Sequence, residues 1–284
     1  MQTDTHLLTK QMFQPALPAR AVDAHKGSSG SVAIIGGDCS MLGAVLLAAR
    51  AALFSGTGRI YAAMLCQTAL SVDPLHPEIM MRTPDAIATL AQLSAVVIGP
   101  GLGQSDVATE LLTCWLKKET PLLLDADALN LIAKYPHLAE LVKSRQAATI
   151  VTPHVGEAAR LMSLSVAEIQ GNRVETAIRL AKLLQVICVL KGAGTVIAEK
   201  DGQYWINSTG NPALAAGGTG DVLAGIIASL MAQGLMPVYA AKLGVYVHGA
   251  AADTLVEGVG PVGLTASEVL IEVRNVLNQL NKTA

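Results

Sequence analysis

Short apolar runs that alternate with helical patterns place the strongest constraint on the fold of this chain. Val, Ile, Leu and Ala dominate these runs, which are bounded by glycine, proline or polar residues. The runs expected to form strands are 31–36, 59–65, 95–99, 121–125, 148–152 and 186–190. Strands without polar alternation are typical of a parallel sheet covered by helices on both faces. The pattern therefore predicts an α/β fold with a doubly wound, mostly parallel sheet.

Helical patterns fill much of the chain between these strands. They cover 41–54, 106–118, 128–134 and the segment that starts at Asp221, with a break near 258–263. Ser165 and Glu168 match a capping box, a pattern that marks the start of a helix. We therefore expect one long helix from this point to about residue 184.

A hairpin is expected near one edge of the sheet. Residues 195–200 and 204–207 alternate in polarity around Asp201-Gly202, a pair typical of a tight hairpin turn. The chain contains no linker, low-complexity tract or internal repeat. We expect residues 1–284 to form a single domain, with 1–24 as an N-terminal lead-in.

Composition narrows the classes of partner and the location. The net charge of −2 and the 15% of charged residues give no reason to expect nucleic acid or an anionic membrane as a partner. No apolar run reaches the roughly 18 residues of a membrane span, and the N-terminus does not resemble a signal peptide. A cytoplasmic location is therefore expected. The four cysteines lack metal-site spacing and are expected to be free thiols, namely Cys39, Cys66, Cys114 and Cys188.

Residues 211–221 read Asn-Pro-Ala-Leu-Ala-Ala-Gly-Gly-Thr-Gly-Asp and carry the most information about function. The apolar run 222–230 predicts a helix, so Gly217, Gly218 and Gly220 lie at its N-terminus. Free amides and the helix dipole make that position suitable for a phosphate. Asp221 does not fit a simple phosphate site, because its carboxylate repels phosphate unless it acts on a neighbouring hydroxyl. From these residues alone, a helix cap and a catalytic role for Asp221 remain equally open.

Three further polar loops follow predicted strands, at 99–103, 152–157 and 191–195. Ligands of open α/β sheets bind beyond the carboxyl ends of the strands, so we expect these loops to line one edge. The 99–103 loop is a poor dinucleotide fingerprint, because Gln104 follows its last glycine. The 191–195 loop can present amides and a lysine to nucleotide phosphates, or it can be an ordinary turn between strands.

Two strand ends carry side chains suited to a polar substrate, one in the 152–157 loop and one after the strand 121–125. His154 lies at the loop edge in Thr-Pro-His-Val-Gly-Glu, where Pro153 and Glu157 alone fit an ordinary helix start. Asp125 and Asp127 follow another strand, and such acid pairs either hold Mg²⁺ through water or cap the next helix. We favour capping for Asp127 and leave the role of Asp125 open.

Six motifs stand in a characteristic order along the chain. They are His25-Lys26-Gly27, Gly36-Gly37-Asp38 with Gly43-Ala44, Gly99-Pro100-Gly101-Leu102-Gly103, Asp125-Ala126-Asp127-Ala128-Leu129-Asn130, Thr152-Pro153-His154-Val155-Gly156-Glu157 and Gly217-Gly218-Thr219-Gly220-Asp221-Val222-Leu223. In this order they resemble the ADP-dependent NAD(P)H-hydrate dehydratases, from about His25 to the C-terminal helices. The resemblance implies a ribokinase-like fold and the repair of NADH or NADPH to which water has added at the nicotinamide ring.

The resemblance also implies a reaction and a set of site residues. The S epimer of the hydrate is dehydrated at the expense of ADP, giving AMP, phosphate and the restored dinucleotide. Mg²⁺ is implied as the ion that neutralises the phosphates, with ligands that the sequence leaves unknown. The implied hydrate contacts are Ala44, Gly103, His154 and Asp221, with Asp221 as the catalytic base. The implied nucleotide contacts are Lys191, Gly192, Ala193, Gly194, Thr195 and Gly220.

Partners and alternatives follow from the same resemblance. Many members carry an additional epimerase domain, for which this chain is too short, so a separate NAD(P)H-hydrate epimerase is expected. A homotetramer is implied because the family is often tetrameric. The alternative function is a ribokinase-like kinase of a small alcohol, such as a vitamin precursor. A function as NAD-dependent dehydrogenase is less favoured, because the chain lacks the dinucleotide-binding fingerprint. A function as non-catalytic nucleotide-binding module is also less favoured, because it gives Asp221 no role.

Overall fold

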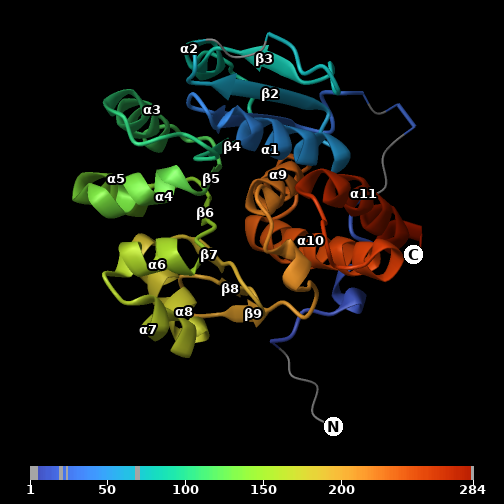
Figure 1. Cartoon of the computed structure of the whole chain (residues 1–284). Coiled ribbons are helices and arrows are strands. Elements are labelled where there is room, and N and C mark those ends of the chain that lie inside the picture. The colour runs from blue at the N-terminus through green and yellow to red at the C-terminus, as the bar shows by residue number, and fades with distance from the viewer. Residues whose placement is uncertain (1–5, 19–21, 24, 68–70, 283–284) are drawn as a thin grey trace.

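The computed structural model describes residues 6–18, 22–23, 25–67 and 71–282. Within these residues, nine strands form one sheet in the order β3-β2-β1-β4-β5-β6-β7-β8-β9 (Figure 1). Their bounds are β1 Ser31–Gly36, β2 Arg59–Met64, β3 Met80–Arg82, β4 Ala95–Ile98, β5 Leu122–Leu124, β6 Thr149–Val151, β7 Ile187–Leu190, β8 Val196–Ala198 and β9 Tyr204–Ile206. The first seven strands in this order, from β3 through β2 and β1 to β7, pair in parallel. The β8–β9 hairpin adds two antiparallel strands at one edge. The predicted sheet and edge hairpin are confirmed.

Helices cover both faces of this sheet. Figure 1 shows α1, α9, α10 and α11 on one face and α3 to α8 on the other. The helices are α1 Leu42–Phe54, α2 Pro84–Ala88, α3 Asp106–Leu116, α4 Asp127–Lys134, α5 Pro136–Ser144, α6 Val155–Met162, α7 Val166–Gly171, α8 Arg173–Leu184, α9 Thr219–Ala232, α10 Pro237–Val259 and α11 Ala266–Lys282. Strand β1 is buried along its whole length, with Val32 and Ile34 in one core and Ala33 and Ile35 in the other. Burial on both faces explains why its sequence shows no polar alternation.

Two expectations from the sequence are wrong. The helix expected from Ser165 to residue 184 is two helices, because Asn172 leaves helical geometry at φ −138° and ψ 51° between α7 and α8. The capping box at Ser165 is present but starts only the short α7. Cys39 and Cys66 are joined in a disulfide instead of being free thiols, whereas Cys188 is a buried free thiol. Residues 27 positions apart in sequence gave no spacing signal for this pairing.

The described part of the N-terminal lead-in packs against the rest of the fold. Leu8 and Phe13 are fully buried, and the Leu8 amide donates to the Ile206 carbonyl at 2.9 Å. Residues 1–5, 19–21 and 24 of the expected lead-in lie outside the described residues. Over the described ranges, no helix is both long enough and apolar enough to span a membrane.

The strand order reverses at β1, because the chain proceeds outward through β2 and β3 and then returns to β4 on the other side. At the carboxyl ends of β1 and β4, the Gly37 amide donates to Pro100 O at 3.0 Å and the Asp38 amide to Gly101 O at 2.6 Å. Such a reversal opens a crevice at the carboxyl edge of a doubly wound sheet. The fold therefore places the candidate site at the edge that the sequence predicted.

Helix α9 is held close to α1 by a glycine. A Cβ at Gly225 would overlap the Ala48 carbonyl oxygen and lie 2.8 Å from Ala51 Cβ. We expect Gly225→Ala to lower the free energy of unfolding by roughly 1–3 kcal/mol, although alanine is the better helix former. Gly258→Ala is the control, because a Cβ at this exposed glycine of α10 would meet no atom within 4 Å. Urea unfolding should show the control unchanged or stabilised, and equal behaviour of the two variants would contradict the close packing.

Candidate active site

The N-terminus of α9 is built from glycines that bring bare backbone into the site. Gly218 is the N-cap with φ 88°, and a Cβ there would overlap Leu47 of α1. Asp221 is the third residue of the helix, and no side chain caps the helix. The helix-cap interpretation of Asp221 is therefore wrong. Its carboxylate instead lies in the first turn, near the free amides of the helix end.

A cluster of charged side chains lies against this helix end. Lys191 Nζ, at the end of β7, donates to Asp125 Oδ1, at the end of β5, over 2.6 Å. Both side chains are largely buried, with exposed fractions of 17% and 2%. A Cβ at Gly220 would lie only 3.3 Å from Lys191 Nζ, so the first turn of α9 lies close to the ammonium group. Three elements far apart in the sequence thus meet at one buried cation.

Acidic groups outnumber the cation in this cluster, and the pKa values respond to that excess. Burial, then Asp125 and Glu157, raise the pKa of Asp221 to about 7, while Lys191 acts in the opposite direction. Burial lowers the pKa of Lys191, but Asp125, Glu157 and Asp221 outweigh burial and raise it. Lys191 is therefore charged at neutral pH, and Asp221 exchanges its proton near neutral pH. A carboxyl with such a pKa is suited to proton transfer.

His154 and Glu157 cap helix α6. The Gly156 and Glu157 amides donate to His154 Nδ1 at 2.9 and 3.3 Å, and the His154 amide donates to Glu157 Oε2 at 2.7 Å. Because Nδ1 accepts two hydrogen bonds, the ring proton of neutral His154 is on Nε2. Burial, then Lys191 and Arg160, lower the pKa of His154 and keep the ring neutral. The histidine that an ordinary helix start left unexplained is itself the cap.

Capping leaves part of the His154 ring available. Its side chain is 54% exposed, and Nε2 lies 3.3 Å from Glu157 Oε1. The Lys191 amide donates to Pro153 O at 2.8 Å, which joins the His154 loop to the end of β7. The neutral Nε2–H can therefore donate a hydrogen bond toward a substrate at this edge. Capping and substrate contact are compatible in this geometry.

The 99–103 loop forms the other side of the site. The Gly103 amide donates to Asp127 Oδ2 at 2.9 Å, and a Cβ at Gly103 would lie 2.6 Å from Asp38 Oδ2. Asp127 is the first residue of α4 and supports this loop, so the capping role favoured for it is wrong. The N-cap is Ala126, whose φ of 48° is unusual for alanine and places strained backbone beside the site. Ala44 of α1 lies against the same loop, 3.4 Å from a Cβ at Gly101.

The structure brings most of the sequence-predicted residues to one edge, at different distances from the centre. Lys191 lies beside Gly220 and interacts electrostatically with Asp221. Ala44 is linked to them through α1, because Leu47, one turn away, packs against Gly218. The loop 192–195 continues from Lys191 and is exposed except at Thr195, whose hydroxyl accepts from the Gly192 amide at 3.3 Å.

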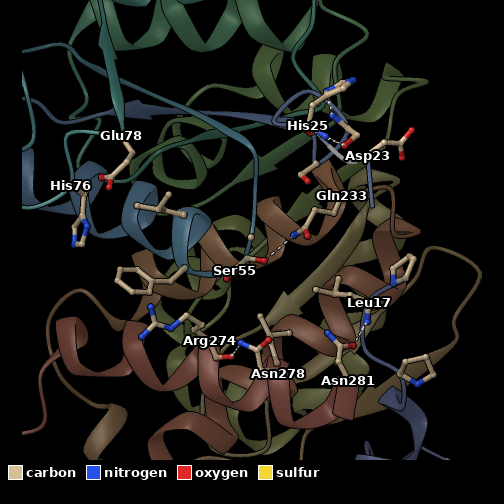
Figure 2. Close-up of a pocket in the computed structure, with 18 residues that line it drawn as sticks. Leu17, Asp23, His25, Ser55, His76, Glu78, Gln233, Arg274, Asn278 and Asn281 are labelled. Carbon is tan, nitrogen blue, oxygen red and sulfur yellow. Dashed lines mark hydrogen bonds between the residues drawn. The ribbon is translucent and has the colours of Figure 1, made fainter. Parts of the chain in front are cut away.

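The His25-Lys26-Gly27 motif does not belong to this group. His25 lines a cavity of about 1180 Å³ between the ends of α1 and α11, together with Ser55, Gln233 and Arg274 (Figure 2). Ser28 and Ser29 of the same segment precede β1, so this cavity lies at the amino edge of the sheet. The carboxylates and the lysine of the cluster described above lie at the opposite edge. This cavity and the titratable cluster are therefore separate features.

Two members of the charged cluster, Asp125 and Glu157, have no catalytic or nucleotide-binding role predicted from the sequence. The sequence leaves two roles open for Asp125, a Mg²⁺ ligand or a helix cap. For Glu157, a favourable interaction with the helix dipole is a sufficient explanation. Both are buried and both act on the pKa of Asp221. Their position at the carboxyl ends of buried strands was the available signal. Their distance from Lys191, 66 residues along the chain for Asp125, hid the interaction.

Comparisons with known proteins agree with this architecture. The family model described as NAD(P)H-hydrate dehydratase matches residues 32–274. The ADP-dependent (S)-NAD(P)H-hydrate dehydratase of Neisseria meningitidis is 39% identical, with 96% of each chain covered. The bifunctional NAD(P)H-hydrate repair enzyme Nnr of Coxiella burnetii is 42% identical over 97% of this chain. Since that match covers 56% of the Coxiella enzyme, the chain spans about half the length of its bifunctional relatives.

Solved structures give the same result. The ADP/ATP-dependent NAD(P)H-hydrate dehydratase of Bacillus subtilis, co-crystallised with ATP and Mg²⁺, is 34% identical with a TM-score of 0.86. The match covers 98% of this chain and 99% of that one. A ribokinase-like superfamily protein of Enterococcus faecalis is 26% identical with a TM-score of 0.82, covering 98% and 96% of the two chains. The ribokinase-like fold is confirmed.

Proposed function

Since this chain belongs to the NAD(P)H-hydrate dehydratase family, we propose that it dehydrates the S epimer of hydrated NADH or NADPH at the expense of ADP. The products are AMP, phosphate and the restored dinucleotide. The observation that carries the proposal is Asp221, a carboxyl with a pKa of about 7 in the first turn of a glycine-rich helix beside Lys191. A base, a cation and the free amides of the helix end therefore lie close together.

Asp221 has a defined role in this reaction. Hydroxide is a poor leaving group, so the ring hydroxyl is first converted to a phosphate ester. Its oxygen attacks the β-phosphorus of ADP, the bond to AMP breaks, and Asp221 takes the hydroxyl proton. The phosphate group then leaves the ring, the neighbouring ring carbon gives up its proton to the departing phosphate, and the double bond between these two carbons is restored. The amides of Gly218–Gly220 and the Lys191 ammonium stabilise the negative charge that develops on the transferred group.

The charged cluster fits Mg²⁺ bound together with a nucleotide. Among the described residues, no group of three or more His, Cys, Asp or Glu side chains is placed to hold a metal ion alone. Mg²⁺ in phosphoryl-transfer sites takes one or two carboxylates, with phosphate oxygens and waters as the other ligands. Asp125 and Glu157 are the carboxylates that would hold it, which leaves Asp221 for the hydroxyl. When bound, the ion neutralises the phosphate charges.

His154 is proposed to contact the hydrate, with Ala44 and Gly103 on the other side of the site. We expect His154→Ala to raise the KM for the hydrate while AMP affinity, measured by calorimetry, stays nearly unchanged. Loss of the cap should also lower stability by about 1 kcal/mol. His154→Asn is the matched variant, because asparagine keeps a cap acceptor and loses the imidazole. A normal hydrate KM in this variant would reduce His154 to its capping role.

The direct test of the proposed function is the recovery of reduced nicotinamide. Purified protein, Mg²⁺ and hydrated NADH or NADPH should regain near-ultraviolet absorbance only after ADP is added. The R epimer alone should react poorly until a separate NAD(P)H-hydrate epimerase is supplied. Absence of recovery with the S epimer would exclude the proposal. A stable phosphorylated alcohol formed from a vitamin-like substrate would favour the alternative kinase function.

The organisation of the protein in the cell is also proposed. Residues 1–284 act as one domain, with 1–24 as the lead-in, and the two helical layers on one sheet support this unit. Four copies form a homotetramer, which light scattering on the purified chain will measure. A cytoplasmic location suits an enzyme that acts on NADH, NADPH and ADP.

A further inference from the structure

Arg173, the first residue of α8, lies beneath the start of the 191–195 loop. Its Nη2 donates to Leu190 O at 3.0 Å and is 3.4 Å from Lys191 O, a second acceptor. Its Nη1 donates to Gln170 Oε1 at 3.3 Å. The guanidinium group therefore holds the backbone carbonyls at the point where β7 ends and the loop begins.

Gly192 makes this contact possible. Its φ is 139°, a conformation that side chains rarely adopt, and a Cβ there would lie 3.0 Å from Arg173 Nη1. The guanidinium group thus lies directly against the loop backbone. In the sequence Gly192 looks like part of an ordinary turn, but in the structure it packs against the half-buried Arg173.

The charge of Arg173 has no acidic partner within the described chain. The four ion pairs found there involve Arg50, Lys143, His154 and Lys191. The Arg173 Nε is buried without a hydrogen-bond acceptor. Burial lowers the pKa of Arg173, and no neighbouring carboxylate opposes this effect. A partly buried cation without a counter-ion is costly, and a bound anion removes that cost.

We propose that Arg173 is a positioning residue of the nucleotide site. It fixes the carbonyls of Leu190 and Lys191, so that the amides of residues 192–195 are held ready for the phosphates of ADP. Its uncompensated positive charge attracts the same phosphates through the loop. This inference rests on the proposed function, which assigns that loop to the nucleotide.

The test separates nucleotide binding from hydrate binding and from folding. Arg173→Met removes the fork and the charge, and Arg173→Lys keeps the charge without the fork. Arg179→Met is the matched control, because Arg179 is an exposed arginine on the same helix. Calorimetry with AMP and with ADP gives the nucleotide affinities, steady-state kinetics give the hydrate KM, and thermal melting reports the fold.

We expect Arg173→Met to weaken AMP and ADP binding by roughly 10- to 100-fold, the loss expected for hydrogen bonds from a charged group. The hydrate KM should change far less, Arg173→Lys should be intermediate, and Arg179→Met should match the wild type. Nucleotide affinity within twofold of the wild type in folded Arg173→Met would overturn the inference. In Arg173→Lys, a rise in the hydrate KM as large as the loss of nucleotide affinity would also overturn the inference. Wild-type protein that fails to bind AMP and ADP would instead refute the assignment of the loop.

Discussion

Asp221→Asn is expected to lower kcat by roughly 10²–10⁴-fold, or about 3–5 kcal/mol of barrier, with the fold intact. Asparagine has nearly the same shape as aspartic acid but cannot accept the hydroxyl proton. Nucleotide affinity should be kept or increased, because the carboxylate no longer repels the phosphates. Initial rates at saturating ADP and hydrate measure the effect. Activity within a few-fold of the wild type, in a variant that melts normally, would end the catalytic assignment.

The same variant has a pH-dependent effect on stability in the absence of Mg²⁺ and nucleotide. The folded-state pKa of Asp221, about 7, is above its ordinary value of 3.8. The stabilising contribution of this group is therefore full below pH 3.8 and is lost as the pH rises toward 7. Asp221→Asn should match the wild-type Tm near pH 4 and exceed it above about pH 7. A variant less stable than the wild type at about pH 8 would contradict the claim that burial and neighbouring acidic groups destabilise the Asp221 carboxylate.

Lys191→Met is expected to lower kcat/KM by roughly 10²–10³-fold, the loss typical when a group that stabilises transition-state charge is removed. It should also destabilise the fold by roughly 3–5 kcal/mol, because Asp125 stays buried without its counter-charge. Thermal melting and initial rates on the same preparation measure both effects. A stable variant would show that Asp125 does not depend on Lys191.

A second substitution separates the two effects. In Lys191→Met/Asp125→Asn the unpaired buried charge is absent, so most of the lost stability should return. Activity should not return, because the cation that faces the helix end is still missing and Asp125, one of the two proposed Mg²⁺ ligands, is replaced by a neutral side chain. Full recovery of activity in the double variant would mean that Lys191 serves only to neutralise Asp125 and that the Asp125 carboxylate is not needed to hold Mg²⁺.

The sheet was predictable because burial on both faces leaves a simple signal. The run 31–36 and the turn Asp201-Gly202 indicated the central strand and the edge hairpin. The break at Asn172 was missed because residues on both sides continue the helical pattern, although Gly171-Asn172 is a pair of residues that commonly ends a helix. Strand β3 was missed since its three residues are too few for a pattern.

The site was predictable in its outline and not in its interactions. The resemblance identified Asp221 and Lys191, and the strand ends identified Asp125 and His154. The sequence did not indicate that His154 caps a helix, since histidine is an uncommon cap. Arg173 gave no signal at all, because its partners are backbone carbonyls 17 and 18 residues away. Contacts of this kind exist only once the fold has formed.

The balance of reactants and products tests the central claim most directly. Wild-type protein is mixed with known amounts of ADP and the S epimer of the hydrate, and AMP, phosphate and reduced dinucleotide are then quantified. Coupled phosphorylation and dehydration predict that the three products form in equal amounts, with ADP consumed to the same extent. No hydrate phosphorylated on its ring hydroxyl should be left at the end. Reduced dinucleotide formed without ADP consumption, or a phosphorylated product that accumulates without release of phosphate, would contradict the account.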